Sequence, residues 1–426
     1  MSTPPSPPVV LIVGCGVAGP VLGIFFKRKG YTPIVFDKVR KLGDAGASLM
    51  LMSNGLKVLN LIGLADAVTS ESKPITALRD ATADGTILGH SNLPGTFPEK
   101  YGQPCASIRR TWLNLALKQR LLDLGVELRE GWELTGVREG EDSVTAVFGN
   151  GSEVTGSFLV GCDGLKSVTR AALLELKGKG EEDLPTYTGL TQTAGISETP
   201  AGLRDEASAM RNYYGDGVHA ITYPVSPTQT SWAVTQRESQ ETAESWRACS
   251  TDELPRQKQD LQAVLGGWNA DVLGLVGSAE RIIKFGLFDR GELRAEEWYS
   301  RRCVLVGDAA HPTSPHLGQG ANQALEDCFH LSHAMPSLDP ESADYQDSLA
   351  MLGPGLADAV FKPFAEKRQP RTSELVKGAR AQGDSRVATG LEAGRERDKA
   401  VRKSFEDPAV IETKFSNLLA EPFQDL

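Results

Sequence analysis

Three glycines near the N-terminus, placed between two short apolar runs, constrain the fold of this chain more than any other feature. The first apolar run, residues 9–13, leads directly into Gly14-x-Gly16-x-x-Gly19, and an amphipathic stretch follows. A second apolar run ends at Asp37. This order predicts a strand, a tight turn, a helix and a second strand, the opening unit of a doubly wound parallel sheet.

Each of these residues has a physical task in a dinucleotide-binding turn. Gly14 allows the tight turn, Gly16 lets the backbone approach a pyrophosphate, and Gly19 lets the helix pack on the strand. Asp37, at the end of the second strand, is placed to accept hydrogen bonds from ribose hydroxyls. The spacing favours a dinucleotide site over a glycine-rich turn without a ligand, although it does not choose between FAD and NAD.

The same region resembles a membrane span at first sight. Residues 9–26 contain no charge, which is the minimum length for a spanning segment. Glycines at turn spacing interrupt this run, and the preceding residues 1–8 carry no basic segment of the kind that opens a signal peptide. We therefore expect a buried strand and helix in a soluble, cytoplasmic protein without stable membrane insertion.

A second candidate half-site lies almost three hundred residues later. The apolar run 303–306 ends in Gly307-Asp308, and a loop rich in proline and glycine leads to a helix that opens at Ala321-Asn322. An aspartate at the end of a strand accepts hydrogen bonds from a polyol, and N–H groups at a helix start favour anionic or carbonyl-rich ligands. This geometry suits the ribityl chain and the pyrimidine edge of a flavin.

Composition narrows the class of protein. The chain has 426 residues, 44 glycines and a net charge of −10. An acidic chain without a basic face is not expected to bind nucleic acid. The six cysteines are scattered, form no metal-spaced cluster with histidine, and are typical of free thiols in a reducing compartment. We expect no metal site.

The pattern along the chain predicts a discontinuous organisation. Residues 8–182 and 299–385 are expected to form the nucleotide-binding domain, and 183–298 an inserted β-sheet domain with a charged helical stretch at 240–275. Residues 386–426 are expected to form a helical tail, and residues 152–160 a single strand of the nucleotide-binding domain. A ligand would then lie between the two layers, where pockets usually form.

Three motifs now stand in order: GCGVAG with Asp37, CDGLKSVTR at 162–170, and GDAAHPTSPHLGQGAN at 307–322. Together they resemble the single-component FAD-dependent aromatic monooxygenases of the p-hydroxybenzoate hydroxylase type, in particular the fungal secondary-metabolite and salicylate-hydroxylase-like enzymes. The resemblance covers about residues 8–385. It implies an α/β fold, in which a Rossmann-like FAD-binding domain of the glutathione reductase type carries an inserted β-sheet substrate domain and a helical tail.

The resemblance also implies roles for individual residues. Asp163 would support FAD and the transient nicotinamide, assisted by Arg170, although it could equally cap the helix that begins near Ser167. Arg110 would reach the phosphate and ribityl region, with a surface arginine as the alternative. The remaining cofactor positions implied are Gly14, Gly16 and Gly19 at the pyrophosphate, Asp37 (where the family more often has Glu) at the adenosine ribose, Ala47 at the flavin edge, Asp308 at the ribityl chain, and Pro315, Gly318 and Gly320 along the isoalloxazine.

This sequence departs from the family at one edge of the flavin pocket. Residues 46–54 have a Gly-Ala-Gly and Pro-Asn shape in the family, but Ser48 replaces the second glycine and Ser53 the proline. That edge of the flavin pocket therefore departs from the family pattern at two positions.

The implied activity is oxygenation of an electron-rich aromatic, indole or alkene by way of a flavin C4a-hydroperoxide, with FAD as cofactor and O2 as co-substrate. No second GxGxxG is present, which fits the family, in which the nicotinamide has no Rossmann domain of its own. NADPH is the expected donor, with NADH as the alternative. Secondary metabolism is the expected setting. The alternatives are a flavin halogenase or oxidase on the same fold, against which stand the missing WxWxIP segment and flavin-attachment motif, and a non-catalytic binding protein. The oligomeric state stays open.

The residues that contact the substrate are harder to predict. Tyr223, in the segment HAITYPV, matches a Tyr-Pro position that lies against the substrate in many relatives, with a structural sheet tyrosine as the alternative. Relatives that hydroxylate phenols usually have an arginine about thirty residues upstream, and this chain has none there, which favours a less acidic substrate. Arg211 could substitute only if its side chain points inward. The histidines show no metal spacing, and a catalytic role is not expected for any of them.

Overall fold

A five-stranded parallel sheet forms the centre of the first layer of the computed structural model, which describes residues 7–41, 46–179, 184–204, 207–240 and 248–423. The strand order is β17-β11-β1-β2-β7, and every neighbouring pair is parallel. Four of these strands, β1, β2, β11 and β17, are largely apolar runs because both faces of the sheet are covered there, whereas the edge strand β7 is polar. Their bounds are β1 Val9–Val13, β2 Thr32–Asp37, β7 Glu127–Glu130, β11 Phe158–Gly161 and β17 Cys303–Leu305.

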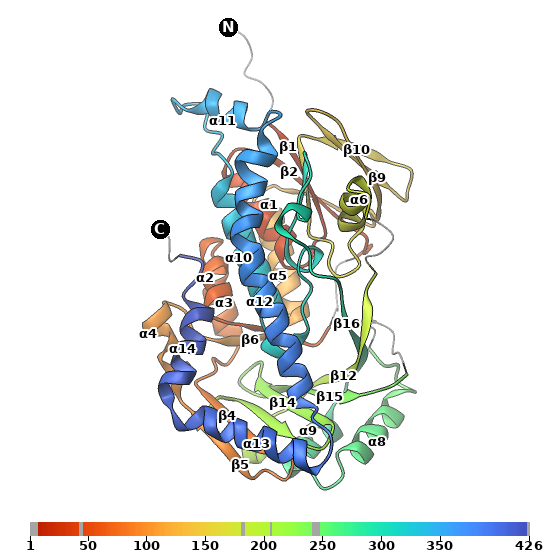
Figure 1. Ribbon diagram of the computed structural model, residues 1–426, viewed down its shortest axis with the longest axis vertical. Helices are drawn as coiled ribbons and strands as arrows, with labels where there is room; N and C mark the ends of the chain where they lie inside the picture. The colour runs from red at the N-terminus through yellow and green to blue at the C-terminus, as the bar shows by residue number, and fades with distance from the viewer. Residues whose placement is uncertain (1–6, 42–45, 180–183, 205–206, 241–247, 424–426) are drawn as a thin grey trace.

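Helices and a small antiparallel sheet cover this parallel sheet and complete the main core (Figure 1). Helix α1, Ala18–Arg28, packs against α5 and α10. The antiparallel sheet has the order β10-β9-β8. The bounds are β8 Leu134–Glu139, β9 Val144–Phe148, β10 Glu153–Gly156, α2 Ser53–Leu61, α3 Ala65–Glu71, α5 Arg110–Asp123, α6 Val168–Leu176 and α10 Gly320–Ala334.

The second layer is a seven-stranded sheet with the order β16-β12-β15-β14-β13-β4-β5. Two of its strands, β4 Ala77–Thr82 and β5 Ile87–Ser91, come from the N-terminal half of the chain, and β4 runs parallel to β13. The seven-stranded sheet thus contains residues 77–91 as well as later ones. The domain division at 183–298 stays a prediction. The other strands are β12 Thr186–Glu198, β13 Ala209–Tyr214, β14 Val218–Pro224, β15 Gln229–Arg237 and β16 Ile282–Asp289.

The two faces of the seven-stranded sheet have different neighbours. Helices α8, Leu254–Val264, and α9, Ala270–Ser278, pack with the short α7, Ala201–Arg204, on the face that carries Trp232 and Val234. The opposite face packs toward the first layer and the C-terminal helices. In the predicted charged stretch 240–275, residues 241–247 lie outside the described residues, and the helices begin at 254.

The C-terminal region is helical, as expected from the sequence. Helix α12, Lys362–Arg386, runs from the first layer to the second (Figure 1), and the predicted start of the tail coincides with its last residue. Helices α13, Leu391–Glu406, and α14, Pro408–Leu419, follow. The side chains of Ile411, Phe415 and Leu419 are buried in a cluster shared with β3 and β4.

A short ribbon contacts both layers. Strands β3 and β6 form a two-stranded antiparallel ribbon. Residues 152–160, predicted as one strand, are divided between β10 and β11, because β10 pairs only with β9 and β11 with β1 and β17. Among the described residues, no helix is both long and apolar enough to cross a membrane. The remaining bounds are β3 Ser48–Leu51, α4 Phe97–Tyr101, β6 Ala106–Arg109 and α11 Tyr345–Met351, which packs on the main core.

Candidate functional site

The polar residues of the three motifs meet at one edge of the parallel sheet. Strands β17, β11, β1 and β2 are consecutive neighbours, and their carboxyl ends lead to Asp308, Asp163, Gly14 and Asp37 in that order. The carboxyl edge of an open parallel sheet is where ligands bind in this architecture. Residues almost three hundred positions apart in the sequence are thus brought to one edge.

The three glycines of the first motif have three different surroundings. A Cβ on Gly14, where φ is +104°, would lie 2.3 Å from the carbonyl oxygen of Cys162, and one on Gly19 would lie 1.9 Å from the Gly14 carbonyl oxygen. A Cβ on Gly16 would meet nothing within 4 Å. Gly14 and Gly19 are therefore required by packing, whereas Gly16 borders open space of the kind that a pyrophosphate needs.

Asp37 closes the turn from the opposite side. One of its carboxylate oxygens accepts a hydrogen bond from the Cys15 N–H at 2.7 Å, and the other accepts one from the Val39 N–H at 2.8 Å. A carboxylate has about four lone-pair positions, so capacity is left for ribose hydroxyl groups.

Asp163 is occupied by the helix that follows it. Its oxygens accept hydrogen bonds from the Ser167 hydroxyl at 2.6 Å and from the Thr169 N–H at 3.0 Å. This geometry matches the helix-capping alternative considered for Asp163. Arg170 is fully buried and donates to the carbonyl oxygens of Ala310, at 3.1 Å, and Gly291, at 2.6 Å, so it fastens this helix to the loop after β17.

Arg110 and Ala47 meet at the ribbon between the layers. The Arg110 N–H, at the start of α5, donates to the Ala47 carbonyl oxygen at 3.2 Å. Ala47 directly precedes β3, and its side chain packs on the apolar cluster of the seven-stranded sheet. A cavity of about 190 Å³ opens beside Ala47, between the β12–β16 edge of that sheet and Arg109.

The 307–322 loop carries the second half-site. Asp308 and Pro315 are exposed, and Gly318 adopts a left-handed conformation with φ +62°. The Asn322 side chain donates to the carbonyl oxygens of Gly318, at 2.8 Å, and Met50, at 3.0 Å, so it ties the loop to β3. The motif predicted only that Asn322 lies at the start of the helix; the structure shows that its side chain also fixes the loop to β3.

A buried ionic network supports this loop from behind. Asp327 accepts hydrogen bonds from the Gly307 N–H at 2.9 Å and the Arg368 guanidinium at 2.7 Å, and it contacts the His311 ring at 2.6 Å. Arg368 also donates to Glu326 at 2.7 Å. Burial alone would raise the pKa of Asp327, but His311 and Arg368 together lower that pKa below its usual range. The charged network holds the start of the loop in one position.

Tyr223 lies on the face of the seven-stranded sheet that is turned toward β3. Its hydroxyl is 2.9 Å from the Ser48 hydroxyl, which is itself 2.7 Å from the hydroxyl of Ser231. Burial raises the pKa of Tyr223, so this phenol keeps its proton at neutral pH. The predicted substrate tyrosine and the departure at Ser48 therefore meet in one contact.

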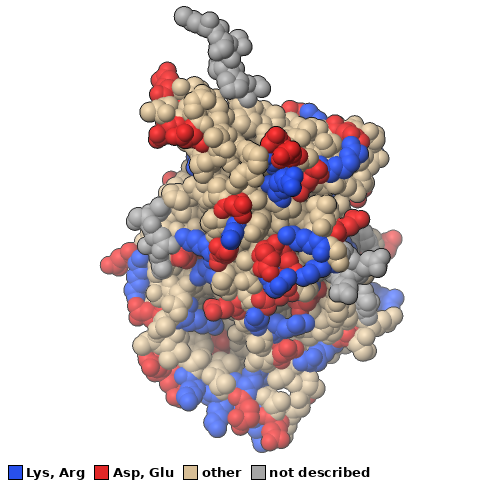
Figure 2. Space-filling model, turned by 45° about the horizontal axis from the view of Figure 1, so that its top comes forward, with Lys and Arg blue, Asp and Glu red and all other residues tan. Residues whose placement is uncertain are grey.

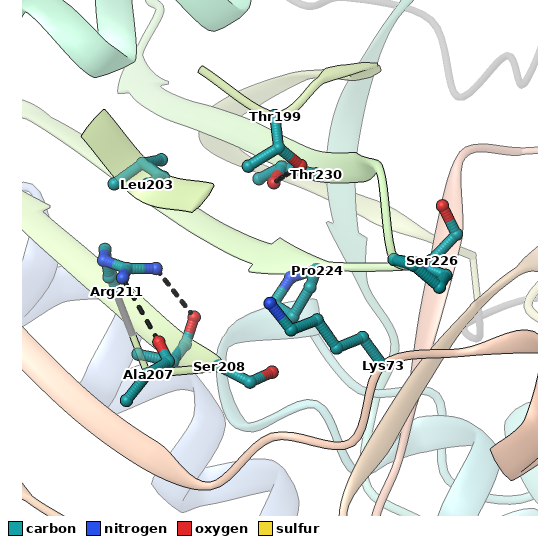
Figure 3. A pocket seen from close by; sticks show the side chains of 11 residues that line it. Lys73, Thr199, Leu203, Ala207, Ser208, Arg211, Pro224, Ser226 and Thr230 are labelled. Atoms are coloured by element: carbon teal, nitrogen blue, oxygen red, sulfur yellow. Dashed lines mark hydrogen bonds between the residues drawn. The ribbon is translucent and has the colours of Figure 1, made fainter. Parts of the chain in front are cut away.

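Arg211 lies on the other face of this sheet. It stands opposite Thr222 in the β13–β14 ladder, and because successive side chains alternate, it faces away from Tyr223. Its guanidinium donates to the carbonyl oxygens of Ala209, at 3.2 Å, and Ala207, at 3.4 Å (Figure 3). The adjoining pocket of about 10 Å³ has room for a single water molecule. The condition that Arg211 point inward is not met.

A polar cluster on the inner face was missed by sequence reasoning. Asp80 accepts hydrogen bonds from Asn212 at 2.8 Å and Tyr214 at 2.7 Å, and Asn212 accepts one from Arg386 at 3.2 Å and contacts His219 at 3.1 Å. Arg386 also donates to the His316 carbonyl oxygen at 2.7 Å, which links the sheet to the 307–322 loop. The only signal in the sequence was polar residues inside predicted strands.

The arrangement fits an adenine dinucleotide that carries a flavin. The turn at Gly16 borders open space, Asp37 keeps acceptor capacity at the ribose end, and Asp308 is exposed at the other half-site. Acidic and basic side chains are interspersed over the molecular face shown in Figure 2, without an expanse of one sign. The features that could hold the cofactor are therefore local to the sheet edge.

Comparison with known protein families supports this assignment. Residues 8–344 match the family described as the FAD binding domain. The chain is 31% identical over 375 residues to 3-amino-4-hydroxybenzoate 2-monooxygenase of Streptomyces cremeus, which covers 87% of this chain and 86% of that protein. It is 26% identical over 389 residues to 3-hydroxybenzoate 6-hydroxylase of Klebsiella oxytoca, which covers 90% and 89%.

Solved structures share the fold. HpxO of Klebsiella pneumoniae in complex with FAD and uric acid has a TM-score of 0.77 at 20% identity and covers 96% of this chain and 97% of that one. A salicylate hydroxylase in complex with its substrate has a TM-score of 0.75 at 20% identity and covers 98% and 96%.

Proposed function

Because this chain belongs to the FAD-binding-domain family of aromatic monooxygenases, we propose that it uses NAD(P)H and O2 to oxygenate a small, electron-rich aromatic or indole compound. The observation that carries this proposal is the convergence of Gly14, Asp37 and Asp308 at one sheet edge, with the loop after Asp308 tied through Arg386 to the sheet that holds Tyr223. NADPH is the first candidate for the electron donor.

Bound FAD supplies the electron-transfer and oxygen-activating chemistry, and the protein supplies orientation, dryness and hydrogen bonds. Asp37 would accept the hydroxyl hydrogens of the adenosine ribose, and Asp308 those of the ribityl chain. The N–H group of Gly320, at the start of α10, would face the pyrimidine edge, where the helix dipole favours an electron-rich ligand. Gly318, whose own N–H donates to the Pro315 carbonyl oxygen at 3.0 Å, would line the flavin through its backbone.

The substrate would lie between the 307–322 loop and the inner face of the seven-stranded sheet, with Tyr223 against it. Apolar side chains from β3, β13 and α14 line that side, including Met50, Met210 and Phe415. A largely apolar chamber with few polar groups excludes water and orients a small aromatic compound.

The first test is anaerobic reduction of the purified, FAD-loaded protein. Loss of the visible flavin absorbance is followed after addition of NADPH or NADH, with and without a panel of phenols, indoles and prenylated alkenes. Reduction that one compound class accelerates would support the proposal and identify both the donor and the substrate type. A bound flavin that neither nicotinamide reduces would contradict it and favour an oxidase or a halogenase on this fold.

A further inference from the structure

Three hydroxyl groups and one carbonyl oxygen form a continuous chain at the start of β3. The Tyr223 hydroxyl is 2.9 Å from the Ser48 hydroxyl, and the Ser48 hydroxyl is 2.7 Å from that of Ser231. The Ser231 hydroxyl donates to the carbonyl oxygen of Gly195 at 3.3 Å. The chain joins the ribbon between the layers to three strands of the seven-stranded sheet.

The direction of every hydrogen bond in this chain follows from counting hydrogens. Each hydroxyl carries one hydrogen, and a carbonyl oxygen carries none. Ser231 must therefore donate to Gly195, which leaves Ser48 to donate to Ser231 and Tyr223 to donate to Ser48. Three contacts use all three hydrogens, so the Tyr223 hydrogen is already engaged inside the protein.

We propose that Tyr223 meets its ligand only as a hydrogen-bond acceptor, so that this enzyme selects neutral aromatic compounds with an O–H or N–H donor. Phenols, anilines and indoles have such a donor, whereas alkenes, aryl ethers and phenolates do not. The inference rests on the proposed function, in which Tyr223 lies against the substrate. It makes Tyr223 a ligand contact and Ser48 a positioning residue.

Ser48 sets the direction of the Tyr223 hydrogen bond, because its hydroxyl accepts the Tyr223 hydrogen. With the glycine that the family has at this position, Tyr223 would lose the Ser48 acceptor and keep only the more weakly placed Ser231 hydroxyl, so its hydrogen could turn toward a ligand. The chain also ends at a carbonyl oxygen, which cannot take up a proton, so it orients Tyr223 and does not conduct protons. Burial raises the pKa of Tyr223, which keeps its hydrogen in place.

The missing arginine is consistent with this reading. A phenolate at Tyr223 would need a cation nearby to be stable in a largely apolar chamber. Arg211 faces the other side of the sheet, and the guanidinium of Arg386, on the inner face, already donates to the His316 carbonyl oxygen and to Asn212. A neutral donor needs no such partner.

Calorimetric titration of the FAD-loaded protein with matched ligand pairs tests the proposal. The pairs are indole with N-methylindole, and p-cresol with its methyl ether. We expect the donor of each pair to bind roughly tenfold more tightly, which is about the contribution of one hydrogen bond. In Tyr223→Phe, which has no acceptor, the ratio should fall to about one by the same argument.

Variants of Ser48 distinguish the effect of hydrogen-bond direction from the effect of side-chain packing. Ser48→Gly frees the Tyr223 hydrogen, so the methyl ether, which has an acceptor oxygen, should gain affinity, whereas N-methylindole, which has none, should not. Ser48→Thr keeps the hydroxyl and should keep the wild-type ratios. Thr222→Val, on the same strand but on the opposite face, is the matched control and should also keep them.

Several results would overturn the inference. These are equal binding within each pair, binding of p-cresol that tightens as pH rises above the pKa of the phenol, no change in Ser48→Gly, and no binding of any of the four compounds. Reduction of the flavin by NADPH, measured on the same preparation, separates the two proposals. Reduction without donor preference overturns only this inference, and donor preference without reduction overturns only the proposed function.

Discussion

At the carboxyl edge of the parallel sheet, each polar group lies at the end of its own strand or within three residues after it, as part of a short sequence motif. On the inner face of the seven-stranded sheet, the cluster around Asp80 takes Asn212 and His219 from neighbouring strands and Arg386 from the end of α12. The cofactor side is therefore built from local motifs, and the substrate side from contacts between distant segments. Sequence motifs report on the first kind of site and are silent on the second.

The two sides are also fastened by the same helix. Arg368 near the start of α12 binds the acidic pair behind the 307–322 loop, and Arg386 at its end binds both that loop and Asn212. Substitutions on one side at a time, from the largest expected effect to the smallest, test whether the other side responds.

Breaking the buried network should have the largest effect. Arg368→Met leaves the carboxylates of Glu326 and Asp327 buried with less compensation, which should lower the free energy of unfolding by about 3–5 kcal/mol. Urea unfolding of the apoprotein measures this. Arg256→Met is the control, because that exposed arginine lies 3.9 Å from Asp260 and contributes about 0–1 kcal/mol. Equal losses in both variants would contradict the assignment.

Substitutions of the second and third glycines of the first motif should distinguish an effect on folding from an effect on cofactor binding. Gly19→Ala places a Cβ 1.9 Å from the Gly14 carbonyl oxygen and should destabilise the fold by about 3 kcal/mol. Gly16→Ala meets nothing within 4 Å in the protein, so it should leave stability unchanged and weaken FAD binding by roughly tenfold or more. Fluorescence titration of the apoprotein with FAD checks the second half. A stable Gly16→Ala that binds FAD normally would place the pyrophosphate elsewhere.

Removal of Asp37 should weaken cofactor binding and leave the substrate side unchanged. Asp37→Ala loses the carboxylate expected to accept ribose hydroxyl groups, and hydrogen bonds to a charged group contribute about 1.5–3 kcal/mol. We expect FAD affinity to fall by roughly ten- to hundredfold in the same titration, with donor preference of the substrate site unchanged. A loss of ligand preference in this variant would show that the two sides are coupled.

Acid should weaken the fold partly through His316. Burial, helped by the nearby Arg386, lowers the pKa of His316 to about 3, whereas an unfolded histidine has a pKa of about 6.5. Between these values the unfolded chain binds a proton that the folded chain does not, so the free energy of unfolding falls as pH drops from about 6.5 to about 3 and is fully present above that window. In His316→Gln this slope should decrease by up to about one proton. An unchanged slope in urea unfolding at several pH values would contradict the burial of a neutral ring.

The smallest effect is expected at Arg211. Arg211→Lys keeps a cation on the face turned away from Tyr223, where the arginine binds two backbone carbonyl oxygens. Loss of the arginine's two hydrogen bonds should lower the free energy of unfolding by about 1 kcal/mol and change ligand affinity by less than roughly twofold. A large change in ligand affinity, with FAD affinity intact, would return Arg211 to the substrate site.

Much of the cofactor half followed from the sequence. The strand, turn and helix at residues 9–28, the acid at Asp37 and the loop after β17 stand where their spacing predicted, because residues within one strand–turn–helix unit are fixed by short-range sterics. Pairings between distant strands are not fixed in this way. The single strand expected at 152–160 is two strands with different partners, and β4 and β5 joined a sheet expected from later residues only.

The sequence by itself determined the parallel sheet, the identity of the cofactor edge and the family. Only the tertiary structure decided that Arg211 faces away from Tyr223, that Ser48 lies against Tyr223, and that α12 joins both layers. The physical reason is strand register, since a shift of one residue turns a side chain to the other face. Ser48 and Tyr223 are separated by 175 residues, and no local pattern could place their hydroxyl groups in contact.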